Sequence, residues 1–89
     1  KDFVENIHGN IMQYTGKLDN DNIEIFEGDI VSIQGGASYQ GYWEINDTFE
    51  VIYDKYGFLL KNKDYKENFW ITKKIYVIGN IYENPELLN

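Results

Sequence analysis

The sequence predicts an all-β fold, a small SH3-like β-barrel with a short helical turn at its C-terminal end. Aromatic and β-branched residues gather in short runs, and Gly or Asn/Asp clusters separate these runs at intervals of about eight residues. The chain has a single proline, Pro85, which lies close to its end. A barrel is favoured because closure removes exposed sheet edges, and a small two-sheet β-sandwich is the alternative.

The length of the chain predicts one domain over residues 1–89, with a core that must be densely filled. Aromatic residues make up 17% of the sequence and suit such a core. The first residue is Lys1 rather than Met, so a fragment that lacks an N-terminal segment is one interpretation of the chain. Self-association into a homo-oligomer is a further expectation, because a small domain cannot bury every aromatic side chain.

In the first half of the chain, alternating apolar residues predict three strands, at residues 10–15, 23–26 and 30–34. Gly16 closes the first strand, and the Asp/Asn cluster at residues 19–22 predicts a turn, because its side chains mimic backbone turns. Glu27-Gly28-Asp29 predicts a second tight turn. Val31 and Ile33 are expected on one face of their strand. The Gly-rich residues 35–38 are expected to form a flexible loop.

The second half predicts four further strands, at residues 39–45, 48–53, 58–60 and 75–78, and a short one at residues 69–71. Asn46-Asp47 is expected to form a hairpin turn, after which Phe49 and Val51 face one side of the sheet. The hydrophilic residues 61–68 predict a mobile loop. Near the end, Asn84 is expected to be the N-cap and Pro85 the first residue of one helical turn.

The charge of the chain opposes direct nucleic-acid binding. The formal net charge is -7, and all eight basic residues are Lys. Nucleic-acid binders usually carry a basic face in which Arg is prominent. We interpret the negative net charge as a source of solubility. Two alternative interpretations are binding to a basic protein partner and mimicry of DNA. No apolar run approaches the roughly 20 residues that span a bilayer, so no membrane association is expected.

No residue pattern predicts catalysis, a cofactor or a metal site. The chain has no cysteine, and its single histidine, His8, lacks the companions that a zinc site or a nucleophilic pair requires. Residues 19–24 superficially resemble a calcium loop, but Ile23 occupies a ligand position and Glu24 replaces the required Gly. No acidic residue stands in an apolar context that predicts a raised pKa. We therefore expect a protein that is not an enzyme.

The densest aromatic group is the best candidate for an interaction surface. It comprises Tyr39, Tyr42, Trp43 and Tyr56. Packing in the core and cross-strand aromatic pairs are the simpler interpretation of these side chains. The functional interpretation is an exposed recognition patch, as in peptide-binding barrels of this kind.

Two segments carry a resemblance to a known family. The first runs from Met12-Gln13-Tyr14-Thr15-Gly16 to Glu24-Ile25-Phe26-Glu27-Gly28-Asp29-Ile30-Val31, and the second is Val77-Ile78-Gly79-Asn80-Ile81-Tyr82-Glu83-Asn84-Pro85-Glu86-Leu87-Leu88. Together they resemble the YopX family of small phage and prophage proteins. The match is incomplete: Lys17-Leu18 reverses the usual order, Asp21-Asn22 replaces Asn-Gly, and residues 32–76 show no matching motif. Asn tolerates a left-handed turn position, so we expect the turn to be retained.

The resemblance implies an SH3-like β-barrel and implies no activity. The matched residues are interpreted as architectural: Tyr14, Gly16, Gly28, Asp29, Gly79, Asn80, Tyr82 and Pro85. Tyr14, Phe26, Ile30, Ile78, Ile81 and Tyr82 are expected in the core.

These observations lead to a functional hypothesis, a phage or prophage accessory protein of the bacterial cytoplasm that binds a host or phage protein without catalysis. The alternative is a nucleic-acid-related role, as an acidic DNA mimic or a DNA-associated phage factor.

Overall fold

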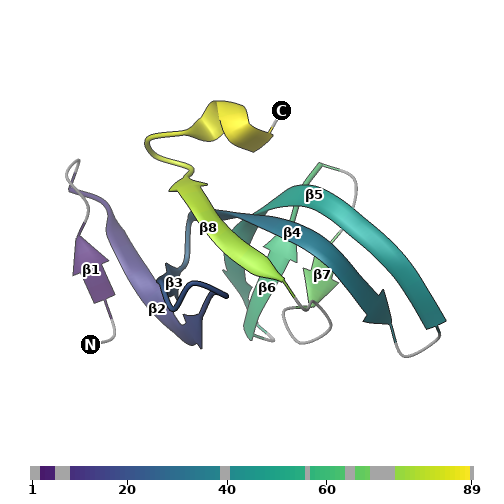
Figure 1. Cartoon of the computed structure of the whole chain (residues 1–89). Coiled ribbons are helices and arrows are strands. Elements are labelled where there is room, and N and C mark those ends of the chain that lie inside the picture. Colours follow the sequence, from purple (N-terminus) through teal and green to yellow (C-terminus); the bar gives the residue numbers. More distant parts are fainter. Residues whose placement is uncertain are drawn as a thin grey trace.

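The computed structural model describes residues 3–5, 9–38, 41–55, 57–63, 66–68 and 74–88. This part of the chain forms eight strands and one short 3-10 helix (Figure 1), which confirms the all-β prediction. The elements are β1 (Phe3–Glu5), β2 (Ile11–Leu18), β3 (Glu24–Phe26), β4 (Asp29–Ser38), β5 (Gly41–Asp54), β6 (Gly57–Lys61), β7 (Lys66–Asn68), β8 (Ile75–Asn80) and η2 (Pro85–Leu88). The strand predicted at residues 69–71 lies outside the described residues.

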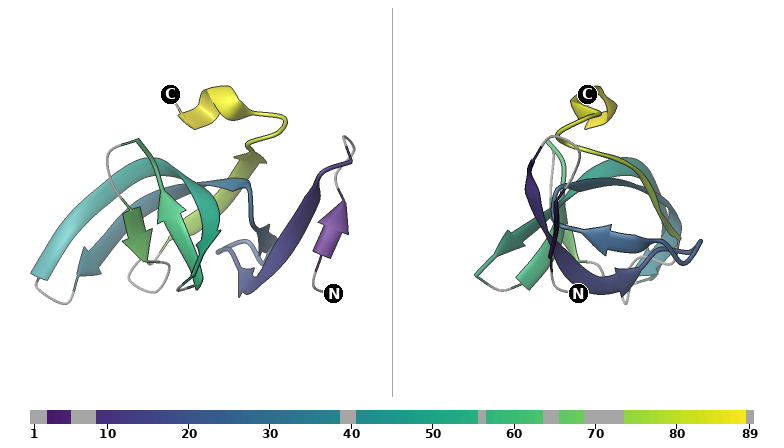
Figure 2. Two further views of the ribbon diagram at one scale, coloured as in Figure 1. Left: turned by 180° about the vertical axis from the view of Figure 1, so that it is seen from behind. Right: turned by 90° about the vertical axis from the view of Figure 1, so that its left-hand side faces the viewer.

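The strands form two antiparallel sheets, one of three strands in the order β1-β2-β3 and one of five in the order β7-β6-β5-β4-β8. Their curved strands surround a common interior in the right-hand view of Figure 2. Within the described residues, β7 and β8 remain the two ends of the larger sheet, so the expected closed barrel is not formed. The two-sheet alternative fits instead. The physical reason is that side chains from the turn after β2, rather than another strand, bind the outer edge of β8.

Two long strands replace a loop and a turn that the sequence predicts. The Gly-rich residues 35–38 belong to β4, where a bulge between Gly35 and Ala37 accommodates the irregularity. Asn46 and Asp47 lie inside β5, opposite Gln34 and Ile33, so the predicted hairpin turn at this position is wrong. Likewise, part of the predicted mobile loop at residues 61–68 forms the end of β6 and all of β7.

A local hydrogen-bond network explains why Asp47 is tolerated inside a strand. Its Oδ1 atom accepts a hydrogen bond from the backbone N–H of Thr48 at 2.8 Å, and its Oδ2 atom accepts one from Asn62 Nδ2 at 3.0 Å. A turn-forming residue therefore enters the sheet because a residue distant in sequence satisfies its carboxylate.

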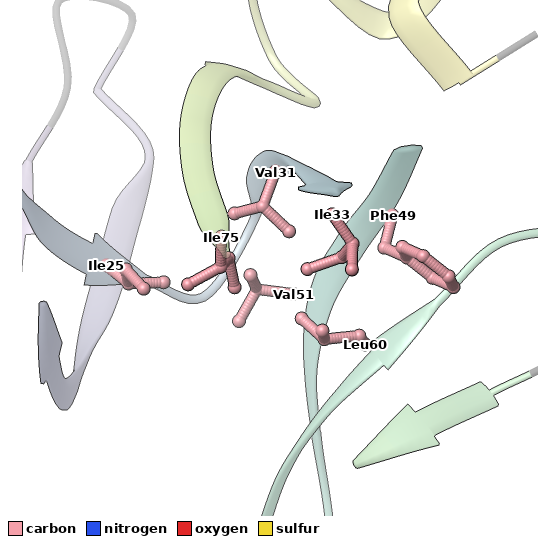
Figure 3. Packing of buried hydrophobic residues seen from close by; sticks show 7 residues of the cluster. All are labelled: Ile25, Val31, Ile33, Phe49, Val51, Leu60 and Ile75. Atoms are coloured by element: carbon pink, nitrogen blue, oxygen red, sulfur yellow. The ribbon is translucent and has the colours of Figure 1, made fainter. Parts of the chain in front are cut away.

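The main core is lined by the larger sheet and is completed by one residue of the small sheet. Figure 3 shows one buried cluster, with Ile25 at one end and Phe49 at the other. Its members are Ile25 of β3, Val31 and Ile33 of β4, Phe49 and Val51 of β5, Leu60 of β6 and Ile75 of β8. The predicted faces of Val31/Ile33 and Phe49/Val51 are confirmed, because all four side chains are fully buried. Because Ile25 comes from the small sheet and the others from the large one, a single cluster holds both sheets together.

Among the residues expected in the core, Phe26 and Ile30 are buried, and Tyr14 and Ile81 are half-buried. Ile78 and Tyr82 are not in the core: their side chains are 44% and 39% exposed. The reason for Ile78 is a register shift in the pairing of β4 with β8, which pairs Gly79 with Ile30 and Val77 with Val31 and leaves Ile78 opposite no residue.

The C-terminal helical turn is confirmed as the 3-10 helix η2, which begins at Pro85. Asn84 precedes it as expected, but its side chain does not act as the cap. Its Oδ1 atom accepts a hydrogen bond from the backbone N–H of Asn80, and only its backbone carbonyl accepts the N–H of Leu87. The side chain therefore stabilises the turn that leads into the helix.

Candidate functional site

The side chains of the predicted aromatic surface lie outside what the structure describes. Tyr39 and Tyr56 lie outside the described residues. Tyr42 and Trp43 lie in β5, but the structure describes their backbone alone, with Tyr42 opposite Ala37 of β4. The interaction role of these four aromatic residues therefore stays a prediction.

The residues of the two matched segments meet at the turn between β3 and β4. The backbone N–H of Glu27 donates a hydrogen bond to the carbonyl of Gln13 at 2.8 Å, and the N–H of Gly28 donates one to the carbonyl of Val51 at 2.9 Å. The carbonyl of Gly28 accepts the N–H of Ile81 at 2.8 Å. Two consecutive residues thus join β2, β5 and the segment after β8, and we call residues 27–28 the junction turn.

Gly28 is required at the junction turn by its backbone conformation and its surroundings. Its φ angle is +91°, a region that L side chains rarely adopt. A Cβ atom at this position would lie 3.0 Å from Cε2 of Tyr82. The Tyr82 ring therefore packs directly over a position that only glycine fills without strain.

Gly16 lies inside a strand rather than at its end, where the sequence predicted it. It does not close the strand but lies in a register shift of β2 between Tyr14 and Lys17, with a φ angle of +83°. No atom lies within 4 Å of the Cβ that a substitution would add. Beside this bulge, the Tyr14 and Phe26 rings pack with centroids 5.3 Å apart.

The segment after β8 is held by its own polar side chains. Oδ1 of Asn80 accepts the backbone N–H groups of Tyr82 and Glu83, at 3.0 and 2.9 Å, and Nδ2 of Asn80 donates to Oε2 of Glu83. A Cβ on Gly79 would lie 2.6 Å from Oδ1 of Asn84. Gly79, Asn80 and Asn84 therefore shape one compact turn, which supports the architectural interpretation.

Asp29 is a buried carboxyl group that the sequence did not reveal. Its side chain is 6% exposed, and its Oδ2 atom accepts the backbone N–H of Phe26 at 2.7 Å across the junction turn. Burial raises the pKa of Asp29 from 3.8 to about 6, and the hydrogen bond from Phe26 only partly opposes this shift. The expectation that no acidic residue lies in an environment that raises its pKa is therefore wrong.

We expect Asp29→Asn to gain stability relative to the parent protein as the pH rises. Because the folded pKa of Asp29 is raised, the native state binds the proton more tightly than the unfolded state. The parent protein therefore loses stability as the pH rises from about 4 to about 6. Asn can still accept the Phe26 N–H but does not titrate. After allowance for screening by solvent, the difference in unfolding free energy should shift in favour of the variant by about 1.5 kcal/mol between pH 4 and pH 7.

Urea unfolding at pH 4, 5, 6 and 7 measures this difference. Glu27→Gln is the matched control, because it removes one negative charge from the same turn. A difference between Asp29→Asn and the parent that stays constant with pH, or that moves in the opposite direction, would contradict the assignment.

A second buried carboxylate, Asp19, lies in the turn after β2. It is 6% exposed, and its Oδ1 atom accepts the backbone N–H groups of Asp21 and Ile23 at 2.8 and 2.9 Å. Its Oδ2 atom accepts the N–H of Val77 on β8 at 2.9 Å. Asn22 has a φ angle of +63°, which confirms that it takes the left-handed position of this turn.

Asn20 completes the attachment of this turn to β8. Its Oδ1 atom accepts the N–H of Ile75 at 2.8 Å, and its backbone N–H donates to the Ile75 carbonyl at 2.9 Å. Ile75 and Val77 are alternate residues, so their N–H groups point to the same side of β8, away from β4. We call Asp19 and Asn20 the edge cap, because they satisfy the backbone groups that an edge strand leaves unpaired.

The edge cap belongs to residues 19–24, the segment that superficially resembles a calcium loop. Both carboxylate oxygens of Asp19 accept backbone N–H groups, so this side chain shapes the turn through hydrogen bonds. In the described part of the chain, no three or more His, Cys, Asp or Glu residues form a group that could hold a metal ion. His8 lies outside that part. No helix within the described residues is long and apolar enough to cross a membrane.

One exposed apolar face lies on the small sheet. Phe3 of β1 and Ile11 of β2 are 58% and 61% exposed. Phe3 is opposite Gln13 and Ile11 is opposite Glu5, so both side chains lie on the same face of the strand pair, while Met12 on the other face is buried. The sequence alone could not distinguish the faces, because both carry apolar residues. We call Phe3 and Ile11 the outer face of β1–β2.

Comparison with known proteins places these features in a family. The family model described as YopX protein matches residues 1–89. Among curated proteins, no match was found. The crystal structure of protein EF1440 from Enterococcus faecalis is similar to this chain, with a TM-score of 0.63 and 34% sequence identity over 90% of the chain, and the match spans 56% of that protein. The chain therefore belongs to the YopX family.

Proposed function

We propose that this YopX-family protein is a non-catalytic interaction module that binds a host or phage protein in the bacterial cytoplasm. The observation that carries the proposal is the outer face of β1–β2, where an aromatic and a branched aliphatic side chain, Phe3 and Ile11, lie together in solvent. Exposed apolar side chains that share one face are typical of protein interaction sites. Aromatic anchors also contribute a large share of the binding energy in such interfaces.

The use of the matched residues supports the same proposal. Gly28, Asp29, Asn80 and the edge-cap residue Asp19 all make contacts inside the chain, across the junction turn, within the segment after β8 or onto the edge of β8. These contacts shape the turns and cover the edge of β8. We therefore assign partner binding to side chains that do not make these internal contacts.

The proposal predicts that Phe3→Ser with Ile11→Ser weakens capture of the partner at least tenfold while the fold is retained. The tagged protein would be used to recover partners from host lysate before and after phage induction, with nuclease-treated and untreated halves, and recovered proteins would be quantified by mass spectrometry. Leu18→Ser with Ile23→Ser is the matched control, because these side chains are similarly exposed at the far end of the β2–β3 hairpin. Circular dichroism checks that each variant is folded.

The results of this experiment distinguish the two candidate surfaces and the two classes of partner. A nuclease-resistant protein that is lost only with the Phe3/Ile11 variant supports the proposal. A partner that survives this variant but is lost with Trp43→Ala would move the interface to the aromatic group of β5. A partner that is displaced by added DNA would favour the nucleic-acid-related alternative, in which the net charge of -7 makes the protein a DNA mimic.

A further inference from the structure

A pocket of about 210 Å³ lies on the larger sheet where β5 and β6 approach the C-terminal helix. Its lining residues are Glu50, Lys61, Asn62, Lys63 and Leu88. Glu50 and Lys61 are directly opposite each other on β5 and β6. Their neighbours Val51 and Leu60 are fully buried, so Glu50 and Lys61 point to the outer face of the sheet. The pocket therefore lies on the side of the sheet away from the core.

The pocket lining carries two lysines and one glutamate in a chain that is strongly acidic overall. Lys61 and Lys63 are exposed, and neither has an ion-pair partner in the part of the chain that the structure describes. Lys66 lies opposite Lys61 on β7. Three of the eight lysines thus lie within residues 61–68, a stretch that also contains Asp64 and Glu67. Lys61 and Lys63 give a small anion two complementary charges in one pocket.

The other lining groups restrict which anion fits. Leu88 of η2 supplies an apolar wall, and η2 is in contact with β5. Glu50 adds one negative charge, which opposes a dianion such as phosphate but can accept a hydrogen bond from an N–H group. Asn62 is fixed in place, because its Nδ2 atom donates to Oδ2 of Asp47. The volume is below the roughly 300 Å³ at which sites for drug-sized ligands begin, so the ligand is about as large as one amino acid.

We propose that this pocket binds an aliphatic carboxylate, with the carboxylate group between Lys61 and Lys63 and the aliphatic part against Leu88. An N-acylated amino acid or the C-terminal residue of a polypeptide carries this chemistry, together with an amide N–H for Glu50. For a ligand of this size, the expected Kd is on the order of 1 mM. The inference is independent of the proposed partner face, because none of its residues belongs to the outer face of β1–β2.

Nuclear magnetic resonance titration of the ¹⁵N-labelled protein tests the proposal, with N-acetyl-L-leucinate as the probe. N-acetyl-L-leucinamide is the matched neutral probe. We expect saturable shifts at the amides of Glu50, Lys61–Lys63 and Leu88 with the carboxylate, and at least tenfold weaker binding of the amide. A tripeptide that ends in leucine, with a free or an amidated C-terminus, distinguishes a polypeptide end from a free small molecule.

Three variants make the test specific. Lys61→Gln with Lys63→Gln should weaken carboxylate binding at least tenfold, whereas Glu50→Gln should strengthen it about two- to fivefold, because it removes the opposing charge. Lys74→Gln is the control, because this lysine is exposed and does not line the pocket. Equal binding of the two probes, shifts that do not saturate, or an effect of Lys74→Gln as large as that of the double variant would overturn the proposal.

Discussion

Asp19→Ala is expected to lower the free energy of unfolding by about 3 kcal/mol at pH 7, the largest effect of any substitution considered. The variant leaves three backbone N–H groups, of Asp21, Ile23 and Val77, without their acceptor. A hydrogen bond to a charged group contributes about 1.5–3 kcal/mol, and losses within one network are not additive. Water can replace part of the acceptor at the exposed side of the turn, which keeps the total below the sum of three separate bonds.

The loss should act on the packing of the two sheets as well as on the turn. The bond from Val77 to Oδ2 of Asp19 joins the hairpin of the small sheet to the edge strand of the large one. Without it, the edge of β8 presents an unpaired N–H group, and an unprotected edge strand favours association with another chain. Light scattering across a concentration series should therefore show stronger self-association of Asp19→Ala than of the parent protein at the same concentration.

Asp21→Ala provides the control for this prediction. It removes a carboxylate and one negative charge from the same turn, but the Asp21 side chain is exposed. Its unfolding free energy should stay within about 0.5 kcal/mol of the parent value. Urea unfolding of both variants decides the outcome, and a similar small change in the two would show that the edge cap does not stabilise the fold.

The effect of Asp19→Ala should also depend on pH, with a sign opposite to that of Asp29. Burial alone would raise the pKa of Asp19, but the N–H groups of Val77, Ile23 and Asp21 outweigh it and lower the pKa below 3.8. The folded state therefore binds the proton less tightly than the unfolded state. The stability that Asp19 contributes is present above about pH 4 and is lost as the pH falls through the lowered pKa. The difference between Asp19→Ala and the parent should shrink in the same interval.

Sequence patterns predicted several local features of the fold, since these depend on neighbouring residues. The alternation of Phe49 and Val51 gave the buried face of β5, and the tolerance of Asn for positive φ gave the conformation of Asn22. Pro85 marked the start of the C-terminal helix. Each of these features follows from a preference that acts within a few residues.

Features that depend on distant partners were not predicted. Asp47 has the local preference of a turn residue, but Asn62 satisfies its carboxylate and the pairing of β4 with β5 continues through it. The burial of Asp29 and the exposure of Ile78 depend on the position of the junction turn and on a register shift in β8. The pocket combines residues of β5, β6 and η2, so no short segment contains its pattern.

Gly28→Ala is expected to lower the free energy of unfolding by about 2–3 kcal/mol. Alanine at a φ angle of +91° carries a conformational penalty of roughly 1–2 kcal/mol. In addition, the new Cβ would lie 3.0 Å from Cε2 of Tyr82, so the ring must move away from the junction turn. Because Tyr82 is partly exposed, the ring can shift by a few tenths of an ångström, which limits this second cost.

Gly16→Ala distinguishes the backbone penalty of a positive φ angle from the cost of the contact with Tyr82. Its φ angle of +83° gives a similar backbone penalty, but its added Cβ meets no atom within 4 Å. We therefore expect Gly16→Ala to cost about 1–1.5 kcal/mol, clearly less than Gly28→Ala. In a Tyr82→Ala background, the cost of Gly28→Ala should fall to that of Gly16→Ala, because only the backbone penalty remains. If the two glycine substitutions cost the same in the parent protein, the packing of Tyr82 on the junction turn would contribute nothing, and Tyr82 would be available to bind a partner instead.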